Sequence, residues 1–141
     1  MAADTPLRTT AAEGRYGRAQ RLEYLRMIDA VGARWVAVFA GDTTFYSAAY
    51  WDLLTAIWGA GKPVRKTDAL GFMKAVKSAH TAGKYVRDAL AEGLIVETPN
   101  PADGRSKLVD LSPRMRRRLD AFFDAAVDQL KAACARLEGK G

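Results

Sequence analysis

The sequence has few of the residues on which disulfide-bonded, metal-binding and membrane proteins depend. One Cys among 141 residues excludes a disulfide framework, and the only histidine, His80, lacks a partner for a metal site. The longest fully apolar run, Trp35 to Ala40, is far shorter than the roughly 20 residues of a membrane-spanning helix. The first 18 residues contain no apolar stretch of the secretory type. We therefore predict a cytoplasmic protein without disulfides, metal or membrane contact.

The usual elements of a catalytic site are also missing from the sequence. It contains no glycine-rich phosphate loop and no pair of carboxylates beside an activating group. We therefore predict that the protein is not an enzyme and needs no cofactor. Its 49% hydrophobic and 27% charged residues are typical of a folded chain, and the length suits a single domain.

The positive charge of the chain is concentrated in one segment. The formal net charge is +6, and residues 62 to 118 contain 13 Lys or Arg against 6 Asp or Glu. The rest of the chain contains 9 basic and 10 acidic residues and is close to neutral. A localised basic segment favours a polyanionic partner such as nucleic acid, although a merely soluble basic protein explains the charge alone equally well.

Apolar periodicity predicts two helices in the first part of the chain. From Gln20 to Ala40 the apolar residues recur every three or four positions, which indicates a long amphipathic helix. A second periodic segment runs from Tyr46 to Trp58, and the glycines and proline of residues 59 to 63 end it. We expect this second helix to be capped by Asp42, Thr43 or Thr44.

The basic segment predicts two short helices and a hairpin. We expect Thr67 to cap a short helix through Val76, and Ser78 to cap another that runs to Glu92 and stops at Gly93. Residues 94–96 and 107–111 have the pattern of two strands, joined by the turn-rich loop 98–106. Ser112-Pro113 then begins a long helix with an apolar seam. Two short helices followed by a hairpin are typical of a winged helix-turn-helix.

Three motifs between Arg87 and Ser112 make the comparison more specific. They are Leu90-Ala91-Glu92-Gly93-Leu94-Ile95 at the end of the second short helix, Asp103-Gly104-Arg105 at the tip of the hairpin, and Val109-Asp110-Leu111-Ser112 at the end of its second strand. The segment resembles the MarR/SlyA family of bacterial transcription regulators. It departs from the family pattern at Gly83-Lys84, where Ser or Thr before Arg is usual, and at Leu70, which lies one position early.

The resemblance implies a mainly α fold with a small β-hairpin wing, that is, a winged helix-turn-helix with long terminal dimerisation helices. We expect residues 1–18 to form a flexible arm and residues 19–141 a single MarR-like domain. Within that domain, 19–61 and 113–141 would be the dimerisation helices and 62–112 the DNA-binding lobe. The resemblance further implies a homodimer on a palindromic operator of double-stranded DNA, acting as a repressor rather than an activator.

The candidate DNA-binding residues come from the second short helix and the wing. They are Ser78, His80, Thr81, Lys84, Arg87, Arg105 and Lys107. Ser78 serves equally well as a helix cap without any DNA contact. Asp103 is expected to orient Arg105 or close the turn. The arginines at positions 114 and 116–118 could contact the DNA backbone or could pair with acidic residues of their own helix.

The terminal helices raise three further possibilities. Their apolar stripes suit burial within one chain or a dimer interface. Cys134 lies on one stripe and is most simply a small buried apolar residue, with a redox role as the minor alternative. Aromatic residues crowd between positions 35 and 58 and are most simply core. The resemblance implies that such a cluster can hold a small aromatic effector, for which the candidate residues are Trp35, Phe39, Tyr46 and Tyr50.

A different class of function remains open at this point. A winged helix can also serve in protein–protein contact or bind nucleic acid without sequence preference. Binding that does not depend on salt would favour the protein–protein alternative, because phosphates would not be involved. Equal competition by random duplex would favour nucleic-acid binding without sequence preference.

Overall fold

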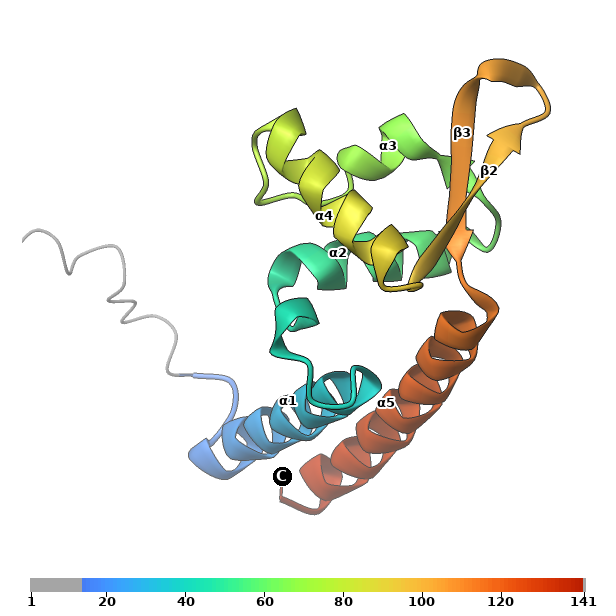
Figure 1. Cartoon of the computed structure of the whole chain (residues 1–141). Helices are drawn as coiled ribbons and strands as arrows, with labels where there is room; N and C mark the ends of the chain where they lie inside the picture. The colour runs from blue at the N-terminus through green and yellow to red at the C-terminus, as the bar shows by residue number, and fades with distance from the viewer. Residues whose placement is uncertain (1–13, 141) are drawn as a thin grey trace, which may run out of the picture. The chain divides into compact units, whose positions relative to one another are not determined.

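The structure, a computed structural model, describes residues 14–140. Thirteen residues of the predicted N-terminal arm, 1–13, therefore lie outside the described part. Figure 1 shows the elements, which are α1 (Arg18–Val38), the 3-10 turn η3 (Thr43–Phe45), α2 (Ala48–Ala60), β1 (Val64–Arg65), α3 (Lys66–Leu70), α4 (Ala79–Ala91), β2 (Ile95–Asn100), β3 (Asp103–Leu111) and α5 (Pro113–Lys140). The predicted architecture, mainly helical with a β-hairpin wing, is confirmed.

The chain divides into two compact units, and the boundaries lie inside α1 and α5. We call residues Arg34–Asp124 the central unit, and the described parts of Met1–Ala33 and Ala125–Gly141 the terminal-helix unit. The central unit contains α2, the short helices and all three strands. It also contains most of the fully buried side chains, with Leu53, Leu54 and Ile57 of α2 at their centre.

The start of α2 differs from the prediction. Ser47, rather than Asp42, Thr43 or Thr44, caps the helix, and its Oγ accepts a hydrogen bond from the Tyr50 N–H at 3.4 Å. Asp42 instead caps η3, because its Oδ1 accepts from the Thr44 N–H at 3.0 Å. The predicted end is confirmed, since Gly61 takes the left-handed conformation with φ 67°.

The first short helix is shorter than the sequence indicated. α3 ends at Leu70, and Thr67 lies inside it, so Thr67 is not its cap; Arg65 precedes the helix without a side-chain capping bond. Phe72, Met73 and Val76 lie in the connection to α4. Met73 is nonetheless buried. Because an apolar residue is needed at this position in the core, the apolar spacing of the segment resembled that of a helix.

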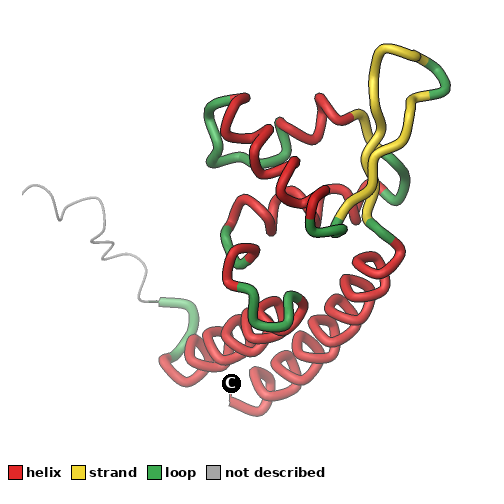
Figure 2. Tube along the Cα trace, in the orientation of Figure 1, coloured by secondary structure: helices red, strands yellow, loops and turns green. Residues whose placement is uncertain are grey.

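The hairpin is longer and its turn tighter than predicted. β2 and β3 pair antiparallel from Ile95↔Leu111 to Asn100↔Asp103, with an irregularity between Pro99 and Asn100. The predicted loop 98–106 is therefore mostly strand, as Figure 2 shows. A third strand, β1, was not predicted; it pairs with β3 through Val64↔Val109 and gives the order β1-β3-β2. Two residues are too few for periodicity to reveal a strand.

Candidate nucleic-acid interface

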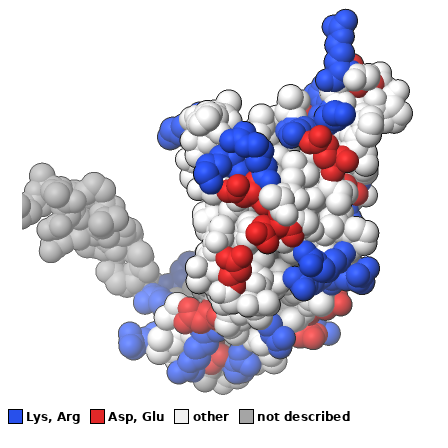
Figure 3. Space-filling view, in the orientation of Figure 1, with Lys and Arg blue, Asp and Glu red and all other residues white. Residues whose placement is uncertain are grey.

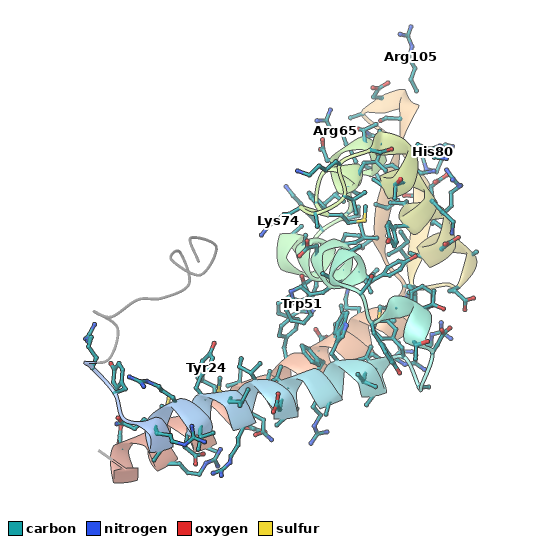
Figure 4. The ribbon with its side chains drawn as sticks, turned by 90° about the vertical axis from the view of Figure 1, so that its left-hand side faces the viewer. Tyr24, Trp51, Arg65, Lys74, His80 and Arg105 are labelled. Atoms are coloured by element: carbon teal, nitrogen blue, oxygen red, sulfur yellow. The ribbon has the colours of Figure 1, made fainter. Side chains whose placement is uncertain are left out.

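Helix α4 is amphipathic, and its outer face carries most of the predicted DNA-binding residues. Ala82, Val86 and Ala89 are buried. They are four and three positions apart, so they form one face of the helix, which packs against the core. His80, Thr81, Lys84 and Arg87 are exposed on the other side. Figure 4 shows the position of His80 on α4. α4 thus gathers these four side chains on one solvent-facing surface.

The start of α4 is fixed by the predicted cap. The Ser78 Oγ accepts a hydrogen bond from the Thr81 N–H at 3.3 Å, and Gly93 ends the helix region with φ 72°. Both features agree with the sequence prediction. The hydroxyl of Ser78 therefore has a structural task, while its side chain remains exposed.

The wing places Arg105 at its tip. Asp103 Oδ1 accepts a hydrogen bond from the Arg105 N–H at 3.0 Å, so Asp103 holds the backbone of the turn. Asn100 braces the other side, with its Nδ2 donating to Ser106 Oγ at 2.9 Å and its Oδ1 accepting from the Ala102 N–H. The Arg105 side chain points away from the ribbon at the tip in Figure 4. The turn thus fixes the backbone at Arg105, while its long cationic side chain extends into solvent.

Several cations of the central unit form ion pairs with nearby carboxylates. Lys84 Nζ lies 2.9 Å from Asp88 Oδ2, and Lys66 Nζ lies 2.6 Å from Glu97 Oε2. Arg65 donates twice to Asp68, and this hydrogen bonding raises the pKa of the Arg65 guanidinium. Figure 3 shows basic side chains over α4 and the wing, with acidic ones beside them.

Other cations make no ion pair within residues 14–140. Arg87 and Lys107 belong to this group, and so does the side chain of Arg105. Unpaired cations can neutralise the phosphates of a partner without first breaking a bond inside the protein. Arg87, Arg105 and Lys107 are therefore cations of this surface that are available to an anionic partner.

A hollow of about 360 Å³ lies between α3, α4 and the wing. α3 contributes Lys66 and Thr67, α4 contributes Gly83 and Arg87, and β3 contributes Arg105 and Lys107. Sequence reasoning missed Lys66 and Thr67. The run of cations and hydroxyls at residues 65–67 was the available signal, but only the β1–β3 pairing places it beside the wing.

Three of the four arginines at the start of α5 bind groups elsewhere in the described part of the chain. Arg114 donates to the Glu92 carbonyl at 3.2 Å, Arg116 pairs with Asp110, and Arg118 donates to the Val38 carbonyl at 3.4 Å. Their partners are not the acidic residues of their own helix that the sequence suggested. These side chains fasten α5 to other elements of the central unit.

Comparison with known structures identifies this arrangement of helices and strands. No family model matches the chain, and no curated protein matches its sequence. A transcriptional regulator from Thermotoga maritima has a TM-score of 0.58 and 20% sequence identity, over 85% of this chain and 82% of that chain. A MepR variant from S. aureus bound to an oligodeoxyribonucleotide has a TM-score of 0.63 and 13% identity, over 87% and 84%.

A third structure is that of a MarR variant from E. coli complexed with operator DNA. It has a TM-score of 0.53 and 14% identity, over 83% of this chain and 78% of that chain. The chain has the MarR-type winged helix fold. In this fold α4 is the second helix of the helix-turn-helix and β2–β3 is the wing, so the predicted DNA-binding residues fall on these two elements, apart from Ser78, which caps α4.

The aromatic residues proposed for an effector site lie together in the central unit of this MarR-type fold. The ring centroids of Trp35 and Phe39 are 4.9 Å apart, and those of Phe39 and Tyr46 are 6.2 Å apart. Tyr50 is 1% exposed, and its hydroxyl donates to the Tyr85 carbonyl at 3.3 Å. Trp35 Nε1 is buried and has no hydrogen-bond partner in the described part of the chain.

The terminal-helix unit combines a buried ion pair with exposed apolar residues. Glu23 of α1 is 2% exposed and pairs with Arg136 of α5 and with Arg26. The exposed large apolar residues of this unit are Tyr16, Tyr24, Leu25, Ile28, Val127 and Leu130. Cys134 is exposed, so its assignment as a buried apolar residue is wrong; the helix turns its thiol away from the seam that holds Ala133.

Two further findings concern membranes and metals. None of the helices in residues 14–140 is long and apolar enough to cross a bilayer. The same residues contain no group of three or more His, Cys, Asp or Glu side chains placed to hold a metal ion.

Proposed function

We propose that the protein is a transcriptional regulator, rather than an enzyme, that binds double-stranded DNA with sequence preference and acts as a repressor. The observation that carries the proposal is the exposed surface shared by α4 and the wing. His80, Lys84 and Arg87 project from one face of α4, and Arg105 and Lys107 follow on β3. Side chains of α4 would contact base edges in the major groove, while the wing would contact the adjacent backbone or minor groove.

The proposal extends to a homodimer. Leu25, Ile28, Val127 and Leu130 are each 44–53% exposed in the terminal-helix unit, a large apolar surface for a protein in water. A second copy of the chain would cover it. Two-fold symmetry would also match a palindromic operator whose half-sites lie about one helical turn apart. A regulator of this kind works in the cytoplasm, where the absence of disulfides is normal.

Replacement of Arg105 tests the DNA-binding role of the wing. Arg105→Ala removes a cation at the wing tip and should weaken operator binding by about 1–3 kcal/mol if the side chain contacts base edges, and by less if it contacts phosphate. Arg34→Ala removes an equal charge from an exposed position on α1 and serves as the control. Fluorescence anisotropy with labelled duplex measures both variants. Equal affinities for the two variants would remove the wing from the mechanism.

We also propose that a small aromatic acid releases the DNA by binding beside Trp35, Phe39, Tyr46 and Tyr50. Because Tyr50 already donates to the Tyr85 carbonyl, Tyr46 is the residue with a hydroxyl available for the ligand. Adding aromatic carboxylic acids to the protein–DNA complex should lower the anisotropy of the labelled duplex, and Tyr46→Phe should reduce that response while leaving DNA affinity intact. A panel that changes neither DNA affinity nor melting temperature would contradict the proposal.

A further inference from the structure

The glycine in the middle of α4 has no packing reason in this structure. Gly83 lies in the interior of a 13-residue helix, where glycine is less favourable than alanine. A Cβ built at Gly83 would meet only Arg87 Nη1, at 3.2 Å, beyond its own helix backbone. Close helix packing, the usual explanation for such a glycine, is therefore absent. What the missing side chain makes room for is the guanidinium of Arg87.

This placement follows from helix geometry. Side chains of an α-helix lean toward its N-terminus, so the side chain at position 87 runs back over the turn that contains position 83. With no Cβ at Gly83, the guanidinium lies close against the helix backbone. Both residues line the hollow between α3, α4 and β3. Arg87 therefore lines the hollow with its guanidinium beside Gly83.

The remaining walls of the hollow suit an anion. Lys66, Arg105 and Lys107 add three cations, and Thr67 adds a hydroxyl donor. The carboxylate of Glu97 balances Lys66 at 2.6 Å, which leaves the charges of Arg87, Arg105 and Lys107 unbalanced. Ser106 and the apolar side chains of Leu70 and Val86 complete the lining. Several cations around a low-dielectric concave site raise its affinity for anions, and a planar guanidinium matches two oxygens of a phosphate.

We propose that this hollow binds a phosphate group and that Gly83 is a positioning residue that holds the Arg87 guanidinium for it. The phosphate belongs either to the DNA backbone, in which case the inference rests on the proposed function, or to a free anion. The role of Gly83 then accounts for the departure at position 83 from the MarR/SlyA sequence pattern. Glycine at position 83 makes the helix less stable than alanine would, but it lets the Arg87 guanidinium lie close to the wall of the hollow.

The variant Gly83→Ala separates this role from any effect on folding. Alanine favours the helix, so the melting temperature should rise by about 2–5 °C. The new methyl group displaces the guanidinium, so phosphate binding should weaken about fivefold or more. Gly59→Ala is the matched control, because Gly59 also lies in a helix and a Cβ there meets nothing within 4 Å. It should bring a similar stabilisation without loss of binding.

Two measurements distinguish the sources of the phosphate. In the first, inorganic phosphate replaces chloride at constant ionic strength, and the melting temperature of the wild type should rise more than that of Gly83→Ala or Arg87→Ala. In the second, anisotropy measures the binding of duplex DNA. A loss for Gly83→Ala, but not for Gly59→Ala, assigns the site to backbone phosphate, whereas an effect confined to inorganic phosphate assigns it to a free anion.

The inference is overturned if Gly83→Ala matches Gly59→Ala in both measurements. That outcome, with wild-type protein still binding duplex DNA, would leave the proposed function intact. If the wild type binds no duplex at all, the proposed function fails, and the inorganic-phosphate measurement still decides whether the hollow is an anion site.

Discussion

Single residues of the central unit show how its core and its surface are coupled. Tyr50 lies in the core, stacks edge-on against Phe45 with ring centroids 4.8 Å apart, and donates to the carbonyl of Tyr85 in α4. Its ring meets that of Tyr85 at 5.1 Å. Because Tyr85 lies between Lys84 and Val86, this one phenol ties the core to the helix that carries the candidate DNA-binding face.

Tyr50 also predicts a loss of stability at high pH. Burial, and secondarily the carboxylate of Asp88 and the neighbouring Tyr85, raise the pKa of the Tyr50 phenol above its ordinary value of 10.0. Above about pH 10 the unfolded chain loses this proton while the native protein keeps it, so the free energy of unfolding falls by up to about 1.4 kcal/mol per pH unit. Tyr50→Phe removes that contribution. Urea denaturation between pH 9 and pH 11 should show a shallower decline for the variant, and identical slopes would contradict the account.

At the scale of elements, the caps of α4 and α5 and the long amphipathic patterns were predictable, whereas the N-terminal caps of α2 and α3 and the short elements were not. Ser78, Gly93 and Ser112 act locally, since each satisfies backbone groups within a few residues, and all three ends are where the sequence placed them. β1 depends on pairing with β3, more than 40 residues away, and has no local signal. α3 appeared too long because Met73 is buried by tertiary contacts in a non-helical segment.

The candidate interface was predictable to the same extent. The residues on α4 could be found because the period of the helix sorts them onto one face, and Arg105 could be found from the turn motif around it. The hollow could not be found, because it requires α3 and β3 to meet α4, which sequence spacing does not reveal. The ion pairs of Lys66 with Glu97 and of Glu23 with Arg136 join elements distant in sequence and were missed for the same reason.

At the scale of the whole molecule, charge and apolar exposure are divided between the two units. The unpaired cations of the hollow belong to the central unit, and the largest group of exposed apolar side chains belongs to the terminal-helix unit. The basic excess of the chain, which has a net charge of +6, lies on the segment that contains α3, α4, the wing and the start of α5. This is the distribution expected of the DNA-binding dimer that we propose.

The most direct test of this account compares a selected duplex with a random one. Duplexes recovered from a random pool by the purified protein compete against random duplex in an anisotropy titration at two salt concentrations, and sedimentation gives the number of chains per duplex. The account predicts a preference of about a thousandfold or more for the selected duplex, affinities that fall as salt increases, and two chains on each palindromic site. Equal affinity for selected and random duplex would contradict it.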